Sequence, residues 1–180
     1  MDYDEVPDER LLAAAIGGTS SAFGMLFTRH RDRVFRHVLR LASTPSDAED
    51  LVGLTFAEAW RKREHVRIVD SSMLPWLLLT ATNLARNSSR AGRRHRLFLS
   101  RLPAPQPEPD HAETTIDAMQ IRQRAQSVRS AFDRLSARDQ RVLTLCILEE
   151  LSTSAVAEAL DVPMGTVKSR LFRARSRLTG

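Results

Sequence analysis

The chain has 180 residues, of which 42% are hydrophobic and 27% charged, an ordinary composition for a soluble globular protein. Its 27 Lys and Arg outnumber 22 Asp and Glu, and the net charge of +5 favours a polyanionic partner. A single cysteine excludes an internal disulfide. The acidic start at residues 1–5 differs from a signal peptide, and the apolar run at 76–79 is too short to span a bilayer. We therefore expect a cytoplasmic protein without membrane insertion.

Charged residues are segregated along the chain. Residues 164–180 carry one Lys and four Arg without any acid, and residues 86–101 are also rich in Arg and free of acids. Residues 102–118 instead hold four acids and no Lys or Arg. This pattern predicts two surfaces that face nucleic acid, separated by a solvated strip.

Apolar residues recur at helical spacing almost throughout, which predicts an all-α fold. The first long helix carries a stripe of Phe23, Phe27, Val34, Val38 and Leu41. After a break at 43–46, the next helix can be capped by Thr44 before Pro45, or by Ser46 with Glu49. Its stripe comprises Ala48, Leu51, Val52, Thr55, Phe56, Ala59 and Trp60. A polar stretch at 61–72 then leads to a third helix that begins near Met73 or Pro75.

The third helix has two faces. Its predicted buried stripe consists of Leu77, Ala81, Leu84 and Ala85. Amide and guanidinium groups on another face suit hydrogen bonding to base edges and phosphates. That second face, the candidate DNA surface of this helix, comprises Trp76, Thr80, Asn83, Asn87, Arg90 and Arg94. Trp76 can be a core residue or a stacking wedge, and its place beside a Leu run favours the core.

Alternating prolines at 102–110 predict an extended, unpacked segment. We therefore expect two small helical domains, at residues 8–96 and 120–180, joined by a flexible, Pro-rich acidic linker at 97–119. The second domain begins with a stripe of Ile121, Ala125, Val128, Phe132 and Leu135. Ser136 with Asp139 can cap the following helix, which is expected to run to about Glu149, and Ser152 starts another.

Residues 151–170 have the pattern of a helix-turn-helix. Asp161 occupies the turn, where a left-handed residue is often needed, and the second helix is capped by Thr166 or begun by Pro163. Apolar residues face inward from both helices at Val156, Leu160, Val167 and Leu171. The N-terminal part of the second helix would enter a DNA major groove. Its candidate DNA-binding residues are Thr166, Lys168, Ser169, Arg170, Phe172 and Arg173.

Residues 163–175, from Pro163 to Arg175, resemble the C-terminal signature of extracytoplasmic-function sigma factors of bacterial RNA polymerase. The first half resembles the same family at residues 22–27, 48–52, 55–60, 75–77 and 81–87. Two signatures in the family's order are more specific than either alone. The resemblance covers about residues 8–96 and 120–178.

The resemblance implies that the first domain binds core polymerase and melts the start-proximal −10 promoter element, with Asn83 at the pocket for a flipped base. It also implies that the linker threads toward the RNA exit and that the C-terminal helix reads the −35 element. The implied partners are promoter DNA, the polymerase clamp coiled coil and flap, and a separate anti-sigma protein. The clamp contact would involve the outer face of the second helix, at Asp50, Gly53, Leu54 and Glu58.

The chain departs from the family pattern at two places. Gly53-Leu54 replaces a Gln-Glu pair of many members, and Gly53 should weaken its helix by roughly 1 kcal/mol relative to Ala. Ala155 replaces an acid near a helix N-terminus, which removes a favourable charge there.

No catalytic site, cofactor motif or metal-spaced cluster is recognisable, so we expect a protein that is not an enzyme and needs no cofactor or metal. The five histidines are scattered, and we expect them at solvated or helix-edge positions. An alternative function is a stand-alone helix-turn-helix repressor or activator, which would usually bind a palindrome as a dimer and would not need the polar face around Asn83. A general RNA-binding protein would instead need interleaved aromatic residues.

Overall fold

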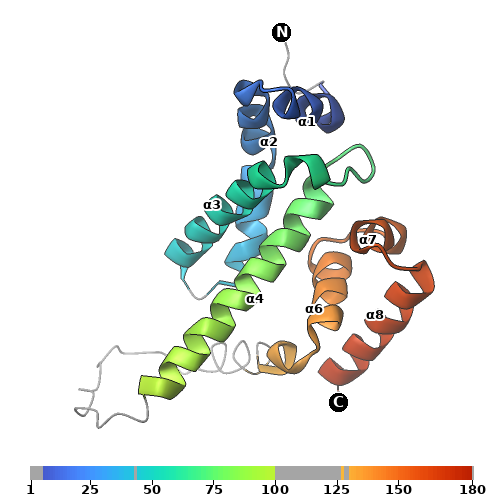
Figure 1. The fold of residues 1–180 in the computed structure, drawn as a ribbon. Coiled ribbons are helices and arrows are strands. Elements are labelled where there is room, and N and C mark those ends of the chain that lie inside the picture. The colour runs from blue at the N-terminus through green and yellow to red at the C-terminus, as the bar shows by residue number, and fades with distance from the viewer. Residues whose placement is uncertain (1–5, 43, 100–126, 128–129, 180) are drawn as a thin grey trace, which may run out of the picture.

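The computed structural model describes residues 6–42, 44–99, 127 and 130–179. Within these ranges the protein is helical, in two domains on either side of the long helix α4 (Figure 1). The N-terminal helices are α1 (Asp8–Ile16), α2 (Ser20–Leu39), α3 (Pro45–Arg61), the short 3-10 helix η2 (Arg63–His65) and α4 (Leu74–Leu99). The C-terminal helices are α6 (Ala137–Leu143), η3 (Thr144–Leu148), α7 (Thr153–Leu160) and α8 (Met164–Thr179). The all-α prediction is confirmed.

The N-terminal core forms where α1, α2, α3 and α4 bury their apolar stripes together. Val34 and Val38 are fully buried, and Phe23 and Phe27 pack edge-on against Phe56 of α3. Of the two possible caps for α3, the structure has Thr44, whose side chain and Asp47 form a reciprocal capping box. Trp60, expected in the buried stripe, is instead partly exposed beneath the guanidinium of Arg63.

Helix α4 buries side chains on two sides. Leu77, Ala81 and Ala85 face the N-terminal core, as predicted. Leu78 is also fully buried, but it packs with the C-terminal helices. The helix begins at Leu74, within the predicted range, and continues to Leu99. Residues 97–99 of the predicted linker are therefore helical, while 100–119 lie outside the described residues.

The C-terminal helices surround their own core, centred on Val142, Leu145, Val156 and Val167. Ser136 and Ser152 cap α6 and α7 as predicted, each accepting a hydrogen bond from the backbone amide three residues later. The helix expected to run to Glu149 is different: α6 ends at Leu143 and continues as the π-helical turn η3. Of the predicted stripe before it, Phe132 and Leu135 pack against Leu143 and Ala174, while Ile121, Ala125 and Val128 lie outside the described residues.

Asp8 ties α1 to the rest of the N-terminal core. Its buried carboxylate accepts hydrogen bonds from the Arg29 guanidinium and the His30 ring at 2.7 Å, and from the Met73 amide at 2.8 Å. Burial raises the pKa of Asp8, but the hydrogen bonds from His30, Met73 and Arg29 outweigh it and hold the pKa far below its usual range. The carboxylate thus joins α1, α2 and the start of α4.

Asp8→Asn should lower the free energy of unfolding at neutral pH by about 3 kcal/mol, because it removes the buried carboxylate that accepts hydrogen bonds from Arg29, His30 and the Met73 amide. The folded-state pKa of Asp8 is lowered, so its contribution is complete above the ordinary Asp pKa and is lost as pH falls toward the lower value. Denaturant unfolding of both proteins should show their difference shrinking below about pH 4. A difference that stayed constant down to pH 3 would contradict the assigned role.

Candidate nucleic-acid interface

Helix α8 presents most of its predicted DNA-binding side chains to solvent. Lys168, Ser169 and Arg173 are exposed, and Phe172 is 74% exposed. Thr166 and Arg170 are half-buried beside them. On the opposite side, Val167 and Ala174 are fully buried and anchor the helix to its domain. The result is a basic surface with one protruding aromatic ring.

The turn before α8 has the geometry that the sequence predicted. Asp161 ends α7 in the left-handed conformation, with φ 55° and ψ 52°. The predicted cap at Thr166 is wrong: α8 begins at Met164, and the Pro163 carbonyl accepts hydrogen bonds from the amides of Thr166 and Val167. Thr166 therefore lies inside the first helical turn. The second predicted possibility, a start at Pro163, describes the helix better.

The predicted polar face of α4 is only partly open to solvent. Trp76 is half-buried against the N-terminal core, which agrees with core packing rather than a stacking wedge. Thr80 and Asn83 are half-buried, and Asn87 is exposed. Arg90 and Arg94 fall within α4, but their side chains lie outside the described residues.

Asn83 is engaged by the C-terminal domain. The Arg141 guanidinium of α6 donates a hydrogen bond through Nε to the Asn83 side-chain oxygen at 2.8 Å. The amide that the sequence marks for base recognition is thus occupied by another part of the same chain. Nothing in the local pattern around Asn83 signals this contact.

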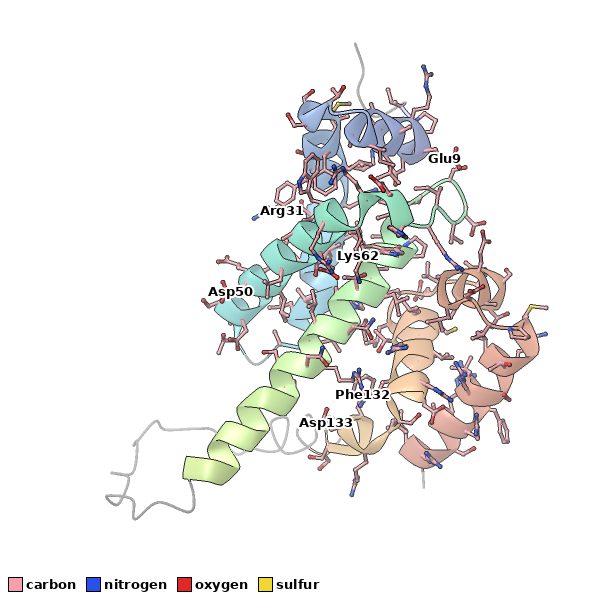
Figure 2. All side chains as sticks on the ribbon, in the orientation of Figure 1. Glu9, Arg31, Asp50, Lys62, Phe132 and Asp133 are labelled. Atoms are coloured by element: carbon pink, nitrogen blue, oxygen red, sulfur yellow. The ribbon has the colours of Figure 1, made fainter. Side chains whose placement is uncertain are left out.

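The predicted polymerase surface lies on the outer face of α3. Asp50, labelled in Figure 2, Gly53 and Leu54 are exposed on the side opposite the buried stripe, and Leu54 is 55% exposed. Glu58 accepts hydrogen bonds from Arg61 and Lys62, which lower its pKa to about 2 and keep it ionised. Together the four residues form a mixed acidic and apolar surface, on the far side of α4 from the C-terminal helices (Figure 1).

A buried group of polar residues that the sequence pattern did not predict lies between the domains. His37 is fully buried and Glu149 is 3% exposed, and their side chains are hydrogen-bonded at 2.9 Å. His30 is also buried, beside Asp8. The prediction of solvated or helix-edge histidines is therefore wrong for His30 and His37. Their spacing of seven residues, in register with the buried Val34 and Val38, was the available signal.

Among the described residues, no group of three or more His, Cys, Asp or Glu side chains is arranged to hold a metal ion. The described helices also include none with the length and apolar character that a membrane span requires.

Two protein families match the chain. Residues 26–95 match the family described as Sigma-70 region 2, and residues 125–178 match Sigma-70 region 4. The chain is 30% identical over 181 residues to the ECF RNA polymerase sigma-E factor of Haemophilus influenzae, covering 97% of this chain and 95% of that protein. It is 29% identical over 191 residues to the ECF RNA polymerase sigma factor SigE of Mycolicibacterium smegmatis, covering 98% and 70% of the two chains.

Solved structures share the fold. CnrH, in complex with the cytosolic domain of CnrY, aligns with a TM-score of 0.60 at 23% identity, over 96% of this chain and 94% of that one. The sigma factor RpoE of Bartonella quintana, in complex with the anti-sigma factor NepR, aligns with a TM-score of 0.52 at 24% identity, over 87% and 93%. The two-domain helical architecture is thus common to these proteins.

Proposed function

The chain belongs to the extracytoplasmic-function family of RNA polymerase sigma factors, and we propose that its two domains recognise different promoter elements. The protein has the promoter-recognising function of a sigma factor. In the proposed division, residues 120–180 read the −35 element through α8. Residues 8–96 bind core polymerase and melt the −10 element, and residues 97–119 link the two.

The solvent-exposed surface of α8 carries the first part of the proposal. Lys168 and Arg173 offer charges for phosphates or base edges, and Ser169 lies between them along the helix. Phe172 offers an apolar contact of the kind that recognises a thymine methyl group. Because a helix N-terminus also favours phosphate, the first turn of α8 suits the entry point into a major groove.

The second part of the proposal assigns strand capture to α4. Asn83 can donate and accept hydrogen bonds at once, so it can recognise the edge of an extruded base. Thr80 and Asn87 flank it along the helix, and Arg90 and Arg94 follow in sequence as candidates for phosphate contacts. In the free protein this use of Asn83 requires the Arg141 hydrogen bond to be released.

We further propose that α3 docks on the polymerase clamp coiled coil through Asp50, Gly53, Leu54 and Glu58. The proposed partners also include the polymerase flap, promoter DNA and an anti-sigma protein. The last of these is supported by RpoE, which was solved in complex with the anti-sigma factor NepR, and by CnrH, which was solved in complex with the cytosolic domain of CnrY. The proposed place of action is the cytoplasm, where the polymerase itself supplies all catalytic chemistry, without a cofactor from this chain.

The double substitution Gly53→Gln with Leu54→Glu should leave polymerase binding intact or strengthen it. A Cβ at Gly53 meets no atom within 4 Å, so the longer side chain fits and the helix should gain roughly 1 kcal/mol. Copurification of the chain with core polymerase by size exclusion measures the result, with Glu49→Gln, on the same helix, as the control. Loss of binding in the double variant alone would show that Leu54 makes an essential apolar contact.

The same copurification tests the proposed function against the repressor alternative. The wild-type chain should elute with core polymerase as one copy per enzyme. A protein that bound duplex DNA as a dimer and never eluted with polymerase would overturn the proposal.

A further inference from the structure

The C-terminal domain covers one side of α4. Leu78 is fully buried in a cluster with Val142, Leu145, Val156 and Val167, all from the C-terminal helices. Leu74 and Leu79 of α4 pack against the same cluster. This side of α4 is adjacent to Asn83, so the contact that buries Leu78 also brings Arg141 to the Asn83 side chain. Figure 1 shows the C-terminal helices lying along α4 on the side away from α3.

A group of hydrogen bonds centred on the buried carboxylate of Glu149 joins the domains beside this apolar contact. Glu149, at the end of η3, accepts hydrogen bonds from two side chains of α2, Arg33 Nε at 2.9 Å and His37 Nδ1 at 2.9 Å, and from Arg40, directly after α2, at 3.0 Å. The other ring nitrogen of His37 lies 2.9 Å from the Thr82 hydroxyl on α4. We call these five residues the Glu149 cluster. It connects α2, α4 and the C-terminal domain.

Hydrogen bonds satisfy the buried polar atoms at the centre of the Glu149 cluster. The Thr82 hydroxyl donates to the Leu78 carbonyl at 2.8 Å, so it is placed to accept a hydrogen bond from His37. Both ring nitrogens of His37 therefore have a hydrogen-bond partner inside the cluster. Burial raises the pKa of Glu149, but the hydrogen bonds from His37 and Arg33 outweigh burial and lower it overall. The buried carboxylate of Glu149 is therefore hydrogen-bonded across the interface between the domains.

The backbone that presents Glu149 is unusual. The π-helical turn η3 directly precedes Glu149, and Glu150 follows with a positive φ of 55°. Such turns interrupt an α-helix at an energetic cost and often mark functional positions. Here the turn brings the carboxylate of Glu149 to α2.

A second contact closes the other end of the interface. Val69, in the turn before α4, is 1% exposed and packs against Ala155 and Ala159 of α7. Arg67 pairs with Asp161 at 3.1 Å at its exposed edge. Ala155, which departs from the family's acidic residue, therefore lies where a carboxylate would be packed against the buried Val69.

We propose that the free protein masks its own strand-capture surface: the C-terminal domain closes over Asn83 on α4, and the Glu149 cluster holds it there. The outer face of α3 and the exposed face of α8 remain open in this state. The free protein can thus bind polymerase and duplex DNA, but it cannot bind a displaced single strand through Asn83 until the domains separate. This inference rests on the proposed role of Asn83 for its consequence, while domain closure is measurable without DNA.

Closure can be measured by energy transfer between dyes on the full chain. The dyes are attached at Glu49→Cys on α3 and Ser176→Cys on α8, both exposed positions, in a Cys146→Ala background that leaves no other thiol. The otherwise wild-type chain should show one compact, high-transfer population. Glu149→Gln, which removes the charge but keeps the side-chain shape, should shift molecules to a lower-transfer, broader population. Circular dichroism checks that the variant remains folded.

Two further variants serve as a negative control and as an independent way to open the domains. Glu150→Gln removes the same charge from the exposed neighbouring residue, so it should leave energy transfer unchanged. Ala155→Glu places an acid in the first turn of α7, where the helix itself tolerates it, and should open the domains by burying that charge against Val69. High energy transfer in both Glu149→Gln and Ala155→Glu would overturn the proposal.

Binding of a fluorescent single-stranded oligonucleotide with the −10 element sequence tests the masking itself. The opened variants should bind it at least about fivefold more tightly than wild type, because the competent fraction of molecules rises. Binding of duplex −35 DNA should not change. Opened domains with unchanged single-strand affinity would show that closure does not mask the surface. If the opened variants gained affinity that Asn83→Ala failed to remove, the proposed role of Asn83 would be wrong while closure stood.

Discussion

Asn83→Ala should reduce open-complex formation on a duplex promoter about thirtyfold, which corresponds to about 2 kcal/mol for one lost base contact. An amide at this position can pair with the edge of an extruded base, and extrusion costs a few kcal/mol that the pocket must return. The defect should be smaller on a template already mismatched at the −10 element, where part of that cost is absent. Permanganate reactivity of unpaired thymines, compared on the two templates, measures both effects.

The structure supplies a matched control for this experiment. Asn83→Ala also removes the hydrogen bond from Arg141, which would loosen the closed state of the free protein. Arg141→Ala breaks the same hydrogen bond but leaves the Asn83 amide in place. It should therefore open promoters at least as well as wild type. An equal melting defect in both variants would mean that the interdomain contact, rather than base recognition, explains the effect of Asn83.

Arg173→Ala should weaken binding to the −35 element by about 1–3 kcal/mol if its guanidinium reads a base, with relaxed specificity at one position. If Arg173 instead contacts a phosphate, affinity should fall for all sequences and the salt dependence should decrease by about one ion. Its exposed position on α8 beside Phe172 allows either contact. Salt titrations on cognate and single-substituted duplexes distinguish them, and Lys168→Ala provides a second position on the same surface.

Arg134→Ala is the control for these charge effects. Arg134 is exposed in the same domain but lies outside α8, so its loss should change −35 binding little. The assigned DNA surface would be wrong if Arg173→Ala and Lys168→Ala bound as tightly as wild type across the whole salt range. It would also be wrong if Arg134→Ala were equally defective.

Local rules predicted much of the fold because they depend on neighbours in sequence. The capping serines of α6 and α7, and the left-handed Asp161, satisfy backbone groups within a few residues. The buried stripes of α2 and α3 follow from helical periodicity alone. Trp60 lies in the last turn of α3, where its ring packs edge-on against Phe23 and lies under the Arg63 guanidinium but remains partly exposed.

Contacts between the domains could not be predicted from local sequence patterns. His37 and Glu149 are 112 residues apart in sequence, so no local pattern pairs them, although the register of His37 with Val34 and Val38 indicates that His37 is buried. The polar face around Asn83 was predicted from its spacing, but spacing does not show that Arg141 occupies it. Ala155 appeared only as a lost favourable charge, whereas in the structure it gives Val69 an apolar surface to pack against. Such roles depend on how the two domains meet.

Run-off transcription tests the central claim most directly. Core polymerase should give no specific transcript from a cognate duplex promoter by itself, and the purified chain should restore a transcript that starts at one position. Substitution of either the −10 or the −35 element should abolish that transcript. A chain that bound the promoter but left core polymerase inactive, or that lowered transcription by an independently supplied sigma factor, would contradict the account and favour a repressor.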